Sequence, residues 1–134
     1  MIVVDTNVLA YLAIPGDNLN LAEATLVKDR DWAAPILWRS ELRNVLALYV
    51  RTGKMPVRSA LSAFTDAEAV IAGRNYDVDT MRVLELSLAS GRSAYDCEFV
   101  YLAERLDVPL VTSDKKVLAA FPGRAISMGA FLKS

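Results

Sequence analysis

Short apolar runs that alternate with longer helical patterns are the feature that most constrains the fold of this chain. The first run, MIVVD, is apolar and β-branched up to Asp5, which is typical of a strand buried on both faces. Similar runs follow at residues 32–36 (WAAPI), 108–114 (VPLVTSD) and 124–128 (RAISM). Strands separated by helices form a parallel sheet with helices on both of its faces. We therefore predict a single α/β domain, residues 1–134, with a central parallel sheet flanked by helices.

The segments between these runs have the spacing of amphipathic helices. In residues 37–52, apolar side chains recur at i, i+3, i+4 and i+7 until Gly53 ends the pattern. These apolar residues are Leu42, Val45, Leu46 and Tyr49. The helices predicted from such patterns cover residues 7–16, 19–30, 37–52, 57–73, 78–91 and 93–106, and a terminal turn is expected after the last strand.

Histidine is absent from the chain, and Cys97 is the only cysteine. These two facts exclude Ser-His-Asp triads, Cys-His dyads, internal disulfides and cysteine-based zinc sites. If the chain is an enzyme, its chemistry must depend on carboxylates, hydroxyls, Lys, Arg or a metal ion held by oxygen ligands. The formal net charge of −1 gives no global signature of nucleic-acid binding, so any contacts with phosphates would be local.

Hydrophobic residues make up 54% of the chain, which is a high fraction. No stretch approaches the roughly 18 consecutive apolar residues of a membrane-spanning helix. Asp5 also interrupts the N-terminal apolar run too early for a signal peptide, so we expect a soluble cytoplasmic protein. Because large exposed apolar patches usually mark interfaces, we also expect another chain to cover part of the surface.

Two of the predicted strands end on a carboxylate. Asp5 follows the first strand and Asp114 ends the run at residues 108–114. Both are expected at the carboxyl edge of the sheet, where ligands bind in folds of this kind. An aspartate between a strand and a helix also often caps the helix N-terminus. For either residue alone both interpretations stay open, and the repetition favours a site.

Asp96 and Glu41 are the other candidate site acids. Residues 93–96 (SAYD) match a capping box, in which Asp96 would serve the start of its helix. However, Asp96 is in phase with Phe99 and Val100 on the buried face, where a carboxylate needs a partner. Glu41 has no basic residue three or four positions away, which excludes an ordinary i,i+4 ion pair. Simple solvation of Glu41 at the edge of the apolar stripe remains the alternative.

If these four carboxylates converge, they repel one another unless cations lie between them. Without His or a useful Cys, the fitting cation is a hard, oxygen-loving one such as Mg²⁺ or Mn²⁺. Such an ion can polarise a phosphodiester and stabilise the leaving oxygen. Metal-assisted phosphodiester hydrolysis is therefore the hypothesis for a site formed by Asp5, Glu41, Asp96 and Asp114.

Four motifs, in this order, resemble those of the PIN-domain nucleases, and in particular the VapC-type toxins of prokaryotic toxin–antitoxin pairs. The motifs are VVDTNVL, WRSELRNVL, SAYDCEFVYLAERL and PLVTSDKKVL, and the similarity spans Ile2 to about Met128. The resemblance implies a PIN-like fold with a central parallel sheet between helices. It also implies a Mg²⁺- or Mn²⁺-dependent endoribonuclease.

The resemblance assigns roles to individual residues. The acids that match the family's acidic quartet are Asp5, Glu41, Asp96 and Asp114, of which Asp5 and Asp96 would be the principal metal ligands. The side chains that would hold these ligands in place are Thr6, Asn7 and Thr112. Where some PIN proteins carry a further acid, residues 115–117 of this chain are KKV, which weakens the expectation of a firmly held second metal.

The resemblance also implies partners. Related toxins are typically homodimers, and a small antitoxin covers the active-site groove and often sends an Arg toward the acids. We therefore expect a homodimer and a cognate antitoxin for this chain. Arg39 and Arg43, with Arg51 and Lys54, are predicted to hold the RNA backbone, and ordinary solvated helix charge is the alternative.

Three other interpretations stay open. A phosphate-accepting receiver module would want paired acids in its first loop, but VVDTN has one acid, and Lys115 follows an Asp instead of closing a strand. A non-catalytic binding module would not need the intact acidic set. A PIN-type nuclease with a housekeeping role in RNA processing would have the same residues as a toxin.

Overall fold

The computed structural model describes all residues from 1 to 134 and contains a five-stranded sheet in the order β3-β2-β1-β4-β5. Every pair of neighbouring strands is parallel. The strands are β1 (Ile2–Val4), β2 (Trp32–Pro35), β3 (Asn75–Tyr76), β4 (Leu110–Val111) and β5 (Ala125–Ile126). The predicted α/β fold with a central parallel sheet is confirmed.

The central strand β1 is buried on both faces and paired on both edges. Ile2, Val3 and Val4 are each no more than 1% exposed. Val3 lies between Ala33 of β2 and Leu110 of β4 in the sheet register. A strand in this position needs continuous apolar residues, which is the pattern of the N-terminal run. The first polar residue after it marks the point where the chain leaves the core.

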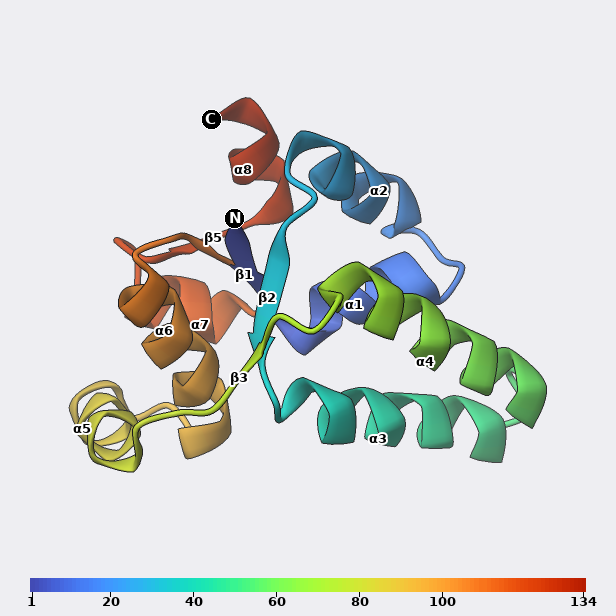
Figure 1. Ribbon diagram of the computed structural model, residues 1–134, viewed down its shortest axis with the longest axis horizontal. Helices are drawn as coiled ribbons and strands as arrows, with labels where there is room; N and C mark the ends of the chain where they lie inside the picture. Colours follow the sequence, from blue (N-terminus) through green and yellow to red (C-terminus); the bar gives the residue numbers. More distant parts are fainter.

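Helices cover both faces of the sheet. In Figure 1, α5 and α6 lie on one side of the strands, whereas α1 to α4 lie on the other. Helix α6 packs directly on β1, β2 and β4, which explains why residues 99–103 are all buried. None of the helices is both long and apolar enough to cross a membrane. The helices are α1 (Thr6–Ala13), α2 (Leu19–Lys28), α3 (Trp38–Arg51), α4 (Val57–Ile71), α5 (Thr80–Ser90), α6 (Ala94–Leu106), α7 (Lys115–Ala120) and α8 (Met128–Lys133).

Helices α3 and α4 run side by side and extend away from the sheet (Figure 1). At the sheet end of the pair, the rings of Trp38 and Phe64 stack with their centroids 5.3 Å apart. The buried indole of Trp38 also donates a hydrogen bond to the side-chain oxygen of Asn75 in β3. Trp38 therefore fixes the start of α3 to both α4 and the sheet.

Three short elements were not among the predicted ones. Strand β3 has two residues and is defined only by its pairing with β2, through Ala34 with Asn75 and Pro35 with Tyr76. Helix α7 follows β4. Helix α8 forms where a terminal turn was expected, so that prediction was wrong. The hydroxyl of Ser127 begins α8 by accepting the amide N–H of Ala130 at 3.1 Å. Unlike the other strands, these three elements were not marked by an apolar run or a helical repeat that was recognised in the sequence.

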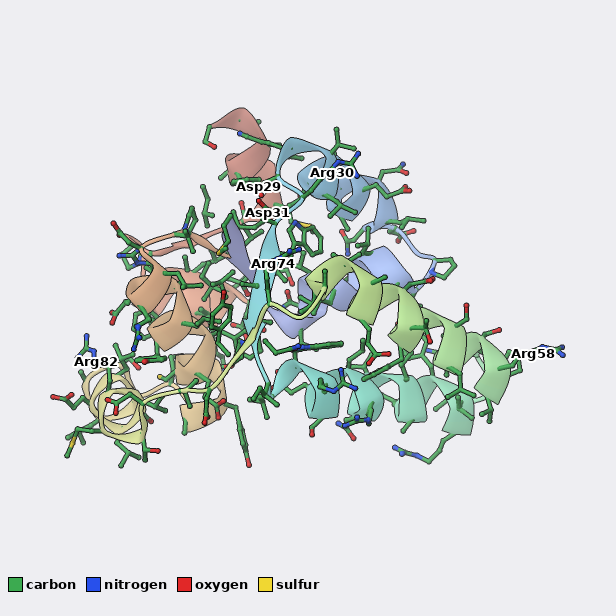
Figure 2. The ribbon with its side chains drawn as sticks, viewed as in Figure 1. Asp29, Arg30, Asp31, Arg58, Arg74 and Arg82 are labelled. Atoms are coloured by element: carbon green, nitrogen blue, oxygen red, sulfur yellow. The ribbon has the colours of Figure 1, made fainter.

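Several arginines away from the carboxyl ends of the strands have structural partners (Figure 2). Arg74 donates to the carbonyl oxygens of Trp32 and Val70, both at 2.9 Å, and so joins the amino end of β2 to α4. Arg82 of α5 forms an ion pair with Glu104 of α6 at 3.2 Å. Arg74 therefore holds β2 and α4 together at the amino edge of the sheet, and Arg82 holds α5 and α6 together.

Candidate active site

Strands β1 and β4 end side by side, and each is followed by one of the predicted acids. Val4 is paired with Val111, and the amide of Asp5 donates to the carbonyl oxygen of Val111 at 3.0 Å. Asp5 then begins α1, and Asp114 begins α7. Parallel pairing of the two strands thus brings together two aspartates from opposite ends of the sequence.

Helices α3 and α6 supply the other two acids from their first turns. Glu41 lies in the first turn of α3, and Asp96 lies in the first turn of α6. An open hollow of about 300 Å³ is lined by all four predicted acids, Asp5, Glu41, Asp96 and Asp114. Its remaining lining residues are Thr6, Asn7, Asn44 and Val45. The fold therefore gathers the predicted carboxylates on one surface.

A buried hydroxyl connects the two strand ends. Oγ1 of Thr112 donates to Oδ2 of Asp5 at 2.7 Å and accepts the amide N–H of Asp114 at 3.1 Å. Asn7 joins the same network, because its side-chain oxygen accepts the amide of Ser113 at 3.3 Å and its Nδ2 donates to Thr112 at 3.5 Å. The loop between β4 and α7 is thereby fixed against the start of α1.

Thr6 connects the start of α1 with α3. Its Oγ1 donates to Oε1 of Glu41 at 2.7 Å, and its amide donates to Oδ1 of Asp5 at 2.8 Å. The side chain is buried, so these hydrogen bonds are shielded from water. One threonine therefore orients two of the four carboxylates.

Asp5 and Asp114 are the N-caps of α1 and α7, and both still line the hollow. Oδ1 of Asp114 accepts the amides of Lys116 and Val117 at 2.8 and 3.1 Å, which is the geometry of an N-cap. At α6 the cap is Ser93, whose hydroxyl accepts the amide of Asp96 at 3.0 Å. Capping and a place in the hollow are compatible at both positions.

Burial makes the negative charge of Asp5 costly. It raises the pKa of Asp5 from 3.8 to about 6, although hydrogen bonds from Thr112 and from the amide of Thr6 lower it. The carboxylates of Glu41 and Asp96 raise the pKa of Asp5 further. A buried acid with this pKa is charged at neutral pH only at a cost in stability, which a nearby cation would reduce.

The same causes act on Glu41 and Asp96. Burial raises the pKa of Glu41, and the charges of Asp96 and Glu98 raise it further. Burial also raises the pKa of Asp96, where the charge of Asp114 adds to the effect and Arg92 opposes it. The charge of one acid therefore raises the pKa of another, as expected of groups that lie close together.

Comparison with known families identifies the fold. The PIN-domain profile matches residues 2–122 of the chain. The chain belongs to the PIN-domain family. PIN domains are generally nucleases, so membership supports a nuclease and confirms the PIN-like fold predicted from the four motifs.

Two solved structures are similar to this PIN domain over nearly its whole length. PAE2754 from Pyrobaculum aerophilum aligns with a TM-score of 0.79 and 22% identity, covering 98% of this chain and 93% of that one. FitAcB from Neisseria gonorrhoeae aligns with a TM-score of 0.75 and 18% identity, covering 96% of this chain and 99% of that one. Among curated proteins, no sequence is significantly similar. At these identities the structural likeness establishes the fold.

The oxygen donors in the hollow of this PIN domain suit a divalent cation, but their present spacing does not. Four carboxylates with hydroxyl and amide neighbours form the all-oxygen environment that Mg²⁺ or Mn²⁺ prefers. A cation beside Asp5 would favour its charged form, which burial disfavours. However, no three acidic side chains are close enough together to hold one ion in this arrangement. Metal binding at the hollow is therefore a proposal.

Arg39 and Arg43, the predicted RNA contacts, lie on the α4 side of α3. Arg39 forms an ion pair with Glu68 of α4 at 2.9 Å. The guanidinium carbons of Arg39 and Arg43 lie 5.1 and 5.0 Å from the ring centroid of Phe64. Both arginines thus pack α3 against α4, and neither lines the hollow. A contact of either residue with the RNA backbone stays a prediction.

Two residues near the acids were not among the predicted site residues. Asn44 lines the hollow and is three residues after Glu41, so helical spacing alone could have placed it on the same face. Glu98 is half-buried, and its charge raises the pKa of Glu41. Burial and the charge of Asp77 raise the pKa of Glu98 in turn. The sequence of α6 alone does not indicate which elements pack near Glu98.

Proposed function

We propose that this PIN domain is a Mg²⁺- or Mn²⁺-dependent endoribonuclease and the toxin of a type II, VapBC-like toxin–antitoxin pair. The observation that carries the proposal is the hollow lined by Asp5, Glu41, Asp96 and Asp114. Four carboxylates would repel an RNA phosphate, so a phosphodiester can bind there only with cations between the two sets of charges.

A divalent ion bound in the hollow would polarise the phosphodiester and stabilise the charge that develops on the leaving oxygen. In this proposal Asp5 and Asp96 are the principal ligands, and Glu41 and Asp114 complete the set. Thr6 holds the carboxylate of Glu41 in place, and Thr112 does the same for Asp5. The hollow is open to solvent, so an RNA strand can reach it without presenting an end, which supports internal cleavage.

The toxin role rests on the resemblance of the four motifs to VapC-type toxins. Helix α5 exposes Met81, Leu84 and Leu88, and α4 exposes Val57 and Leu61, so apolar surface is present for a second copy or an antitoxin to cover. A short upstream reading frame for a small DNA-binding protein would support the toxin role. The alternative is a PIN-type nuclease with a housekeeping role in RNA processing.

Metal removal tests the proposed chemistry. We expect purified protein to cleave single-stranded RNA in Mg²⁺ or Mn²⁺, to stop when EDTA is added, and to recover when excess metal is restored. Gel analysis with end mapping would measure the cleavage and its position. Cleavage that continues at the same rate in EDTA would contradict the metal-dependent mechanism.

Thr6→Val tests whether the hydroxyl that orients Glu41 contributes to this activity. The substitution keeps the shape of the side chain but removes the donor of the 2.7 Å hydrogen bond. We expect cleavage to fall by about 10- to 100-fold, as is usual when a group behind a metal ligand is lost. Thr6→Ser keeps the hydroxyl and is the matched control. Equal rates for the two variants would show that this hydrogen bond is not needed.

A further inference from the structure

A second hollow of about 380 Å³ lies beside the acids, between the first turns of α3 and α6. Its lining residues are Leu37, Ser40, Glu41, Asn44 and Tyr95. Those from α3 recur at i, i+3, i+4 and i+7 and therefore form one face of that helix. Glu41 and Asn44 line both hollows, so the two hollows adjoin and share these residues as a wall.

Tyr95 supplies the aromatic surface of this second hollow. Its side chain is 62% exposed, which is unusual for an aromatic ring next to a buried helix segment. It directly precedes Asp96 in the first turn of α6 and lines the second hollow together with Glu41, an acid of the first hollow. No role in folding accounts for this ring, because the core of the helix begins at Cys97 and Phe99.

From these observations we propose that the second hollow binds the unpaired nucleobase adjacent to the cleaved phosphodiester, with the base stacked on Tyr95. This inference rests on the proposed function and adds a base subsite to it. A base is joined to its phosphate through one sugar, so a phosphate at the acids places the neighbouring base over the shared wall. Single-stranded RNA is recognised by stacking on aromatic rings and by hydrogen bonds to base edges.

The lining chemistry favours a base over other parts of the RNA. Leu37 and Tyr95 offer apolar and aromatic surface to a flat ring, and Ser40 and Asn44 offer a hydroxyl and an amide to its edge. No cation lines the hollow, and the carboxylate of Glu41 is present, so a backbone phosphate would be repelled there. The preference among the four bases would then depend on the hydrogen bonds to Ser40 and Asn44.

An abasic-substrate experiment tests the inference. The probe is a single-stranded RNA whose cleavage position has been mapped, together with versions that carry one abasic residue on either side of the cleaved bond. Stacking contributes about 1–3 kcal/mol, so Tyr95→Ala should lower kcat/KM on the intact RNA by about 5- to 150-fold. Tyr95→Phe keeps the ring and should remain close to wild type. Val27→Ala removes an exposed apolar side chain on α2, which lines neither hollow, and is the control.

The decisive comparison is between the variants and the abasic substrates. The kcat/KM of wild-type protein should fall by a similar factor when the abasic residue is on one side of the cleaved bond. The kcat/KM of Tyr95→Ala should be the same on the intact and the abasic RNA, because the variant lacks the ring on which that base would stack. Equal losses in the two proteins would overturn the inference, as would unchanged cleavage by Tyr95→Ala.

Two further outcomes separate the base subsite from a contact between subunits and from the proposed function itself. If Tyr95→Ala alters the oligomeric state measured by size-exclusion chromatography with light scattering, the ring contacts a second copy and the inference is wrong. If wild-type protein cleaves no RNA at all, the proposed function fails. Cleavage by wild type that does not depend on Tyr95 removes only the base subsite.

Discussion

We expect Asp5→Asn to lower RNA cleavage by more than about 100-fold at pH 7, and Asp96→Asn to do the same. Loss of a group that merely supports a metal ligand already costs about 10- to 100-fold, so loss of a principal ligand should cost more. Asn keeps the size of Asp and can still accept the amide of Thr6, which preserves the start of α1. The measurement is kcat/KM on a defined single-stranded RNA in saturating Mg²⁺.

Asp66→Asn is the matched control for these variants. Asp66 is exposed on α4 and does not line the hollow, so the same change of charge there should leave cleavage at the wild-type rate. Circular dichroism and the melting temperature establish that all three variants are folded. Full activity in Asp5→Asn and Asp96→Asn would contradict a metal site formed by these carboxylates.

In metal-free buffer, the free energy of unfolding should fall as the pH rises from about 4 to about 6. Burial raises the pKa of Asp5 to about 6 in the folded protein, from 3.8. Between these values the folded chain binds more protons at Asp5 than the unfolded chain, so raising the pH destabilises the fold. The shift corresponds to about 3 kcal/mol, a loss that is complete above pH 6. The pKa values of Glu41 and Asp96 are also raised, which acts in the same direction.

Comparison with Asp5→Asn isolates this effect. The variant carries no charge at the buried position, so its free energy of unfolding should change between pH 4 and pH 7 by about 3 kcal/mol less than that of wild type. At pH 7 in EDTA, the variant should be the more stable protein. Urea titrations at pH 4 and pH 7 provide the measurement. Adding Mg²⁺ at pH 7 should stabilise wild type more than the variant. Parallel pH profiles for the two proteins would show that Asp5 does not titrate abnormally.

The sequence predicted the long elements and the acids because both leave signals within one segment. The run Ile2–Val4 is apolar at every position, as a central parallel strand must be, and Asp5 follows it at once. Strand β3 left no such signal, since Asn75 and Tyr76 become a strand only by pairing with β2. The surroundings of Glu98 also left no signal within α6, because its charged neighbours belong to α3 and to the segment before α5.

The arginines of α3 illustrate another limit of the sequence. Their spacing from Glu41 left open whether Arg39 faces the acids or the opposite flank of the helix. Only the position of α4, with Glu68 and Phe64, decides that Arg39 faces away from the hollow. Tyr95 was likewise not among the predicted site residues, since an exposed ring has no periodicity that distinguishes it from surface.

The place of β4 in the sheet determines when a growing chain can complete the acidic hollow. β4 lies next to the first strand in space but is among the last segments in sequence, and it brings Thr112 and Asp114 to Asp5. A chain still on the ribosome, synthesised only as far as α6, has three of the four acids. It still lacks Thr112, whose hydroxyl donates to Oδ2 of Asp5. If the proposed function holds, the strand order alone would delay assembly of the acidic site until synthesis of the chain is nearly finished.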